Sequence, residues 1–195
     1  MSLRYALLAL LTAAPMTGYE ASRRFQSSVG HVWHAPDSQI YPELRKMEAE
    51  GLLAVEAVED GGRGEKRYYR PTEAGIAALK AWMETPLKYA PDRDPAHLKA
   101  AYFEFASLEA ARRTLRDHIE HYEGLLEQWE RQIYEVDSGT SQVLSQRLAG
   151  RSRAEHDRIA AFKRFAYEGL VARAHAEIAW ARSGLRMLDG YSAST

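Results

Sequence analysis

Residues 38–75 read SQIYPELRKMEAEGLLAVEAVEDGGRGEKRYYRPTEAG, and this stretch decides the fold. Its first part has apolar residues at helical spacing, namely Ile40, Leu44 and Met47. Gly51 follows as a helix stop. Two segments with strand character come next, residues 53–59 and 66–70, and the glycines between them favour a tight turn. The stretch therefore predicts a helix followed by a two-stranded wing.

Helical segments lie on both sides of this stretch. Before it, residues 3–13 and 17–28 have helical spacing, and Thr17 and Glu20 have the spacing of a capping box. After it, Thr72 can cap a helix that reaches about residue 84. Three helices, a hairpin and a further helix form a winged helix-turn-helix, a fold that places its recognition helix in the DNA major groove.

The third helix, beginning near residue 37 or 38, has the two faces that a recognition helix needs. The side opposite its apolar stripe carries small, polar and basic residues, with Gln39 at its flank: Ser38, Gln39, Tyr41, Pro42 and Arg45. Arg45 can pair with a guanine edge or contact a phosphate, and Gln39 can pair with adenine. Because Pro42 lacks an N–H, we expect an irregular first turn.

The predicted wing supplies positive charge that the chain as a whole lacks. The net charge is -1, and residues 1–86 hold ten Lys and Arg against eleven Asp and Glu. The wing has one acid, Glu65, and four basic residues: Arg63, Lys66, Arg67 and Arg70. Since phosphate contact depends on the charge of the facing surface, we expect the wing to bind the DNA backbone. The alternative is a solvated charged turn.

The start of the second helix offers a further candidate contact. Thr17 and Tyr19 lie where a helix N-terminus could meet a phosphate oxygen. A cap and a core tyrosine are the alternative interpretation.

Three prolines in residues 85–95, TPLKYAPDRDP, mark a domain boundary. We therefore expect a DNA-binding domain at 1–86, a linker at 87–95 and an all-helical dimerisation domain at 96–190. Within the last region, the predicted helices cover residues 96–106, 107–136 and 152–188, with a polar connection and a helical turn near 143–148.

The long helix carries a heptad seam, with steps of 4, 3, 4, 3 and 4 between its apolar positions: Leu115, Ile119, Tyr122, Leu126, Trp129 and Ile133. The last helix would be roughly 50 to 55 Å long, more than an 86-residue domain needs for packing. We therefore predict a homodimer through the C-terminal helices, with Trp180 and Leu185 added to the seam as interface residues.

The composition and motifs of the chain narrow the remaining classes of protein function. The chain has no cysteine, which excludes disulfides, thiolate metal sites and thiol nucleophiles. The apolar run 5–14 is too short to span a membrane, so a cytoplasmic location is the simplest expectation. His118 and His121 could share a metal, but no third ligand has an obvious spacing and no HExxH, P-loop, GxSxG or GxGxxG motif occurs. We expect no enzyme activity, cofactor or metal.

Three longer strings resemble the N-terminal domain of the PadR family of transcriptional regulators. They are ALLTAAPMTGYEASRRF (9–25), GHVWHAPDSQIYPELRKMEAEGLL (30–53) and GGRGEKRYYRPTEAG (61–75), within a resemblance that covers about residues 5–80. HLKAAYFE (97–104) and EIAWARSGL (177–185) are similar to the larger C-terminal dimerisation region of that family.

The resemblance implies a homodimeric repressor that binds a pseudo-palindromic operator in double-stranded DNA. Carried over to this sequence, the DNA contacts are Thr17, Tyr19, Ser38, Gln39, Tyr41, Pro42, Arg45, Arg63, Lys66 and Arg67. Glu65 departs from the family at a wing position that is often neutral or basic, and Pro71 stands where an aliphatic residue is common.

Two questions stay open at this point. Regulators of this family often respond to small aromatic or lipophilic effectors, and an apolar pocket could be lined by Trp82, Tyr89, Trp129 and Trp180. Ordinary core packing is the alternative for these side chains. The second open question is whether the winged helix binds a protein instead of a specific DNA sequence.

Overall fold

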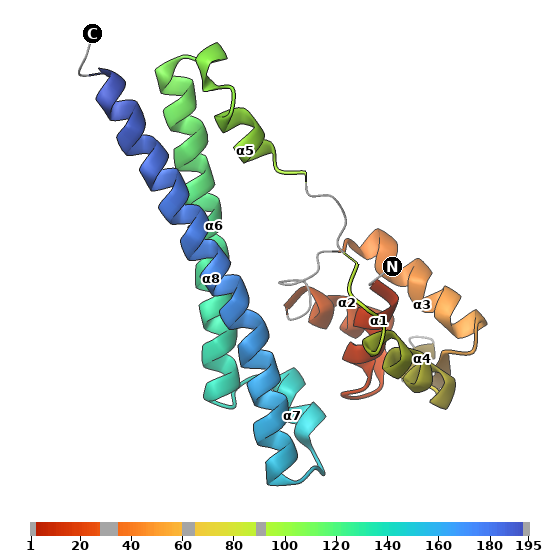
Figure 1. The fold of residues 1–195 in the computed structure, drawn as a ribbon. Helices are drawn as coiled ribbons and strands as arrows, with labels where there is room; N and C mark the ends of the chain where they lie inside the picture. The colour runs from red at the N-terminus through yellow and green to blue at the C-terminus, as the bar shows by residue number, and fades with distance from the viewer. Residues whose placement is uncertain (1–2, 28–34, 60–64, 89–92, 193–195) are drawn as a thin grey trace. The chain divides into compact units, whose positions relative to one another are not determined.

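The computed structural model describes residues 3–27, 35–59, 65–88 and 93–192 (Figure 1). The chain divides into two compact units, Met1–Leu87 with Ser138–Asp157, and Lys88–Asp137 with Arg158–Thr195. The fold is mainly helical with one small antiparallel sheet, which confirms the predicted fold class. None of the helices in the described ranges combines the length and apolar character that crossing a membrane requires.

The first unit contains a winged helix. Its elements in chain order are α1 (Leu3–Leu11), β1 (Met16–Thr17), α2 (Gly18–Ser27), α3 (Asp37–Ala49), β2 (Leu53–Glu59), β3 (Glu65–Pro71), α4 (Glu73–Met83) and α7 (Gln142–Leu148). Its core is built from the apolar stripes of α1, α2 and α3, with contributions from the sheet: Leu7, Leu8, Leu10, Leu11, Met16, Phe25, Ile40, Leu44, Met47, Leu53 and Tyr69.

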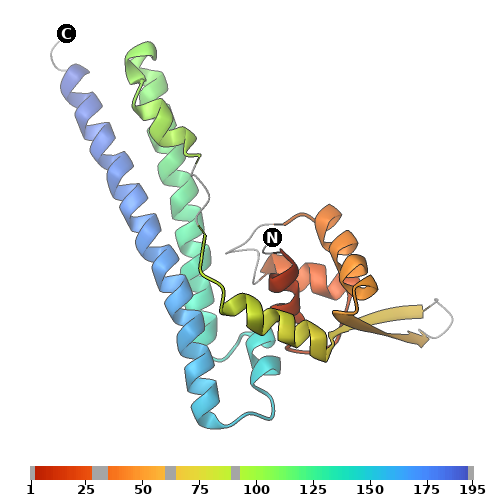
Figure 2. The same cartoon turned by 45° about the vertical axis from the view of Figure 1, so that its right-hand side comes forward.

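The sheet has three strands in the order β1-β3-β2, where the sequence predicted two. The predicted pair β2 and β3 forms the wing, which extends from the helices in Figure 2. β1 adds to its base, where Met16 pairs with Tyr69 and Thr17 with Tyr68. A strand of two residues has no periodicity that a sequence pattern could reveal.

Local side-chain caps fix the helix boundaries, as predicted. Thr72 Oγ1 accepts from the Gly75 N–H at 3.0 Å and donates to the Gly51 carbonyl at 2.7 Å. Gly51 has φ 73°, a left-handed conformation that suits glycine after α3. Pro42 lies inside α3, which is helical from Asp37 onward, so the expected irregular first turn is not found.

The second unit is an antiparallel helical hairpin. α6 (Leu108–Asp137) and α8 (Arg153–Ser192), whose first turn belongs to the first unit, run side by side (Figure 1). The start of α6 is joined to the end of α8 by the Arg112–Asp189 ion pair. The helix predicted at 96–106 is shorter: α5 (Pro95–Ala100) ends before a 3-10 turn, Phe103–Phe105, because Tyr102 has a non-helical backbone with φ -131°.

Candidate nucleic-acid interface

The outer face of α3 is the first candidate surface for DNA. All five side chains that the sequence assigned to this face are exposed: Ser38, Gln39, Tyr41, Pro42 and Arg45. The opposite stripe is fully buried, since Ile40 and Met47 are 0% exposed and Leu44 is 1% exposed. α3 therefore has one face fixed in the core and one polar face available to a partner.

Hydrogen bonds at the start of α2 and α3 hold the helix-turn-helix together. The predicted capping box forms, with the Thr17 N–H donating to the Glu20 carboxylate at 2.8 Å and the Glu20 N–H donating to Thr17 Oγ1 at 3.2 Å. Ser22, which is buried in α2, donates to the Asp37 carboxylate in α3. Tyr19 is 66% exposed and is not a core residue. The Thr17 hydroxyl is therefore hydrogen-bonded within the capping box, whereas the Tyr19 side chain is exposed to a partner.

Gly18 lets the start of α2 approach the recognition helix closely. A Cβ atom at this position would lie 2.9 Å from Tyr41 Cε1 and 3.2 Å from Tyr41 Cδ1. The Tyr41 ring therefore rests against the Gly18 backbone, which orients the ring on the outer face of α3. No local sequence pattern indicates this role of Gly18, because the contact joins residues of two different helices.

The wing is basic, but a carboxylate of α3 neutralises part of its positive charge. Lys66, Arg67 and Arg70 are all exposed on β3. Arg67 Nη2 lies 2.7 Å from the Glu48 carboxylate of α3, so this guanidinium is partly neutralised within the domain. Arg63 belongs to residues 60–64, outside the described part of the chain. The positive surface of the described wing is thus smaller than its four basic residues suggested.

An ion-pair network anchors α3 from α1. Arg4 Nε lies 2.9 Å from Glu43, and Arg4 Nη1 lies 2.7 Å from Glu50. Hydrogen bonds to Glu50 and Glu43 raise the pKa of the Arg4 guanidinium. One carboxylate on α3 and one at its C-cap are therefore compensated inside the domain, which reduces their repulsion toward a phosphate backbone.

The predicted dimer-interface residues all pack within one helical hairpin. Leu115, Ile119, Trp180 and Leu185 belong to one cluster between α6 and α8. The remaining predicted residues belong to a second cluster of that hairpin: Tyr122, Leu126, Trp129 and Ile133. The inference that the heptad seam calls for a second chain is therefore corrected, because α8 of the same chain already covers it. A role of these residues in a dimer stays a prediction.

α8 carries a heptad seam that matches the seam of α6 and was not predicted from the sequence. Its buried and half-buried positions repeat with steps of 4, 3, 4, 3, 4 and 3: Tyr167, Val171, Ala174, Ile178, Ala181, Leu185 and Leu188. Two alanines and a tyrosine weaken the apolar pattern in the sequence. The heptad spacing of these positions indicates a helix whose seam matches that of α6.

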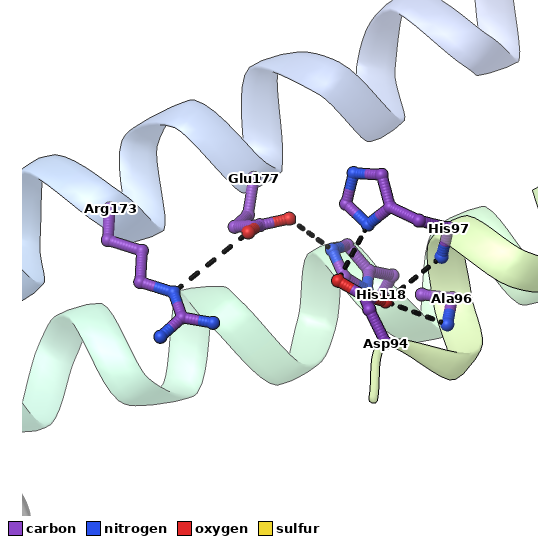
Figure 3. A network of polar contacts seen from close by, with 6 residues as sticks. All are labelled: Asp94, Ala96, His97, His118, Arg173 and Glu177. Carbon is purple, nitrogen blue, oxygen red and sulfur yellow. Dashed lines mark hydrogen bonds and ion pairs between the residues drawn. The ribbon is translucent and has the colours of Figure 1, made fainter. Parts of the chain in front are cut away.

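Polar and aromatic contacts join α5 to this hairpin, and Figure 3 shows the polar contacts around Asp94 and His118. The His97 ring stacks on Trp180 at 3.9 Å, and His97 Nδ1 lies 2.8 Å from Asp94. Backbone N–H donors, first that of His97, lower the pKa of the Asp94 carboxyl group. His118 Nε2 lies 3.2 Å from Glu177, and both side chains are largely buried.

The two histidines considered as metal ligands have separate partners. His118 pairs with Glu177, whereas the ring of His121 lies against Tyr122 at 5.2 Å. Within the ranges that the structure describes, no group of three or more His, Asp or Glu side chains could hold a metal ion.

The aromatic residues considered for an effector pocket lie in different packing environments. Trp82 stacks on Tyr5 of α1 with ring centroids 4.8 Å apart. Trp129 and Trp180 belong to the two separate clusters of the hairpin. Tyr89 lies outside the described residues. Each described tryptophan thus has a packing role within its own unit.

A helix-turn-helix with an antiparallel wing and an exposed polar third helix defines a winged-helix fold. Residues 7–81 match the transcriptional regulator PadR-like family. The chain therefore carries a PadR-like domain, and the resemblance read from its sequence is confirmed.

Two curated relatives support this assignment. The negative transcriptional regulator PadR of Bacillus subtilis is 31% identical over 60% of this chain and 65% of its own length. A protein of Mycobacterium tuberculosis described as a probable transcriptional regulator is 38% identical over 45% of this chain and 46% of its own length. These sequence matches span less than two thirds of the length of either relative.

Solved structures extend the likeness to the helical hairpin. Bacillus subtilis PadR in complex with operator DNA superposes with a TM-score of 0.70 and 23% identity, covering 96% of this chain and 99% of that chain. The same protein with p-coumaric acid gives a TM-score of 0.69. The Vibrio cholerae virulence activator AphA gives a TM-score of 0.69 at 25% identity, covering 97% and 99% of the two chains.

Proposed function

We propose that this protein is a transcriptional regulator that binds a pseudo-palindromic operator in double-stranded DNA as a homodimer. The observation that carries the proposal is the polar face of α3, which is exposed directly opposite a fully buried stripe. This is the arrangement by which a recognition helix enters the major groove. The PadR-like domain at 7–81 and the operator complex of Bacillus subtilis PadR support the same function.

In this proposal, base reading and backbone contact are divided between two elements. The α3 face reads base edges, with Arg45 on a guanine edge or a phosphate and Gln39 on adenine. The start of α2 and the wing contact the backbone through Thr17, Tyr19, Arg63, Lys66 and Arg67. Glu48 already neutralises part of the Arg67 charge, which lowers the contribution of Arg67 to backbone contact. Specificity then depends more on α3 than on bulk charge.

We assign DNA binding to residues 1–86, a linker to 87–95 and dimerisation to 96–190. The support for a second copy comes from large apolar side chains that the hairpin unit leaves exposed, among them Phe105 at 85%, Phe165 at 75% and Phe162 at 66%. Phe162 and Phe165 lie three positions apart in α8 and so share one face of the helix, and a contiguous exposed apolar patch is typical of a protein interface. A homodimer in which these surfaces meet would present two recognition helices to an inverted repeat.

We further assign the regulator to the cytoplasm as a repressor without enzyme activity. Bacillus subtilis PadR is a negative regulator and has been solved with p-coumaric acid, which supports release from DNA by a small aromatic or lipophilic effector. The two-state element would be the angle of the DNA-binding domains about the 87–95 linker. Equal operator affinity with and without a panel of phenolic and cationic lipophilic compounds would argue against such an effector.

A winged helix that binds only proteins is the alternative function, and salt dependence separates the two. For a DNA-binding domain, affinity for random duplex DNA should fall steeply between about 50 and 200 mM salt, because each phosphate contact releases counterions. Arg45→Ala should weaken this binding, whereas Arg116→Ala on α6 serves as the control. Absent or salt-independent binding would favour the protein-interaction module.

A further inference from the structure

The connection between α6 and α8 packs against the winged helix. Its helix α7 is capped by Ser141 and ends before Gly150, which has φ 75°. Val143 packs against the core of the first unit, and Leu144 is buried. The sequence predicts a polar connection with a helical turn here and indicates no packing partner for it. The structure instead makes it a component of the DNA-binding unit.

Arg147 of α7 supplies a positive charge at the C-terminus of α1. α1 has no basic residue in its last turn, and the last carbonyls of a helix lack partners within the helix. The Arg147 guanidinium donates to the Ala9 carbonyl in that last turn. Burial lowers the pKa of Arg147. A cation at this end of a helix is stabilising, so the contact is a specific anchor.

A second polar contact joins α7 to α2, where Arg24 donates to Gln146. α1 and α2 are the helices that hold the recognition helix, through the Arg4 ion pairs and the Ser22 hydrogen bond respectively. α7 is therefore attached to both supports of α3.

The chain segments that connect α7 to the hairpin helices α6 and α8 are short. Four residues, 138–141, connect α6 to α7, and four more, 149–152, connect α7 to α8. Four residues span at most about 14 Å when fully extended. With α7 docked, the winged helix cannot move far from these helix ends, whatever the length of the 87–95 linker.

We propose that α7 is a clip between the winged helix and the helical hairpin, and that Arg147 is the positioning residue that keeps it closed. The clip limits the orientations of the winged helix and so fixes the spacing at which two recognition helices meet DNA. The effect on DNA rests on the proposed function, whereas the clip itself can be measured without DNA.

The absence of cysteine allows a direct test by spin labelling. Ala77→Cys in α4 and Ala176→Cys in α8 are exposed sites in the two units, and dilution with unlabelled protein restricts the distances to one chain. Adding Arg147→Met should raise the population with α7 detached from the winged helix about tenfold, because a hydrogen bond to a charged group is lost. The distribution of distances between the two spin labels should then become broader. Arg153→Met, an exposed arginine nearby, should leave it unchanged. Equal distributions for the two variants would overturn the clip.

Selection from random DNA tests the positioning role. The natural protein should enrich one spacing between half-sites, and Arg147→Met should enrich several spacings with the same half-site bases. An unchanged spacing would overturn the positioning role. If the natural protein enriches no inverted repeat while the distances still broaden, the proposed function fails and the clip stands. Gln146→Ala removes only the bond to Arg24 and provides a milder variant if Arg147→Met unfolds.

Discussion

Replacing Gly75 by alanine should destabilise the winged helix, because the first turn of α4 lies against the backbone at Leu52. A Cβ atom at Gly75 would lie 2.2 Å from the Leu52 carbonyl oxygen and 3.1 Å from Leu8 Cδ2. The Leu52 carbonyl is held in place, since it accepts the Thr72 N–H at 3.0 Å. Thr72 in turn caps α4 through the Gly75 N–H. A methyl group can therefore enter only by separating α4 from this backbone.

Overpacking of this kind costs about 3 kcal/mol when backbone must move, and alanine regains about 1 kcal/mol of helix propensity, leaving a net loss of about 2 kcal/mol. Urea unfolding followed by circular dichroism at one fixed protein concentration measures the change. Gly124→Ala in α6 is the matched control, since no atom lies within 4 Å of its Cβ position, and it should gain about 1 kcal/mol. Equal stability of Gly75→Ala and the natural protein would refute this account of α4 packing.

Three further changes test the interface and the hairpin. Gly18→Ala should weaken operator binding more than it lowers the melting temperature, because its Cβ would meet Tyr41 at 2.9 Å; unchanged affinity would count against the Tyr41 contact. Tyr167→Phe should flatten the pH profile of stability above pH 10. Burial raises the pKa of Tyr167 to about 12, so its contribution is complete below pH 10 and about 2 to 3 kcal/mol is lost as the pH rises toward 12; identical profiles in urea titrations would contradict this. Glu48→Gln should release Arg67 and steepen the salt slope of DNA binding by about one unit, and an unaltered slope would show that Arg67 makes no phosphate contact.

The parts of the fold that could be predicted from the sequence rest on local signals. The caps at Thr72 and at Thr17 with Glu20 follow from side chains that reach backbone groups within the next turn, and both form. The buried stripe of α3 follows from helical periodicity, which also fixes its polar face. Local spacing was therefore sufficient to place the candidate recognition surface.

The parts that could not be predicted depend on contacts distant in the chain. The heptad of α6 indicated a partner helix, but spacing alone does not say whether that helix belongs to the same chain. The Arg147 contact with Ala9 joins residues 138 positions apart, and no local pattern indicates it. The Arg67–Glu48 ion pair likewise lowers the positive charge of the wing below the value counted from its composition, and this pair also joins residues that are distant in the chain.

The most direct test of the central claim is selection of bound sequences from random duplex DNA, with the natural protein and Arg45→Ala compared side by side. The recognition face of α3 predicts that the natural protein enriches an inverted repeat. It also predicts that Arg45→Ala loses preference at one base pair of each half-site, at a cost of about 1 to 3 kcal/mol. Absence of any enriched repeat with the natural protein, or the same repeat read equally well by Arg45→Ala, would contradict DNA reading through this face.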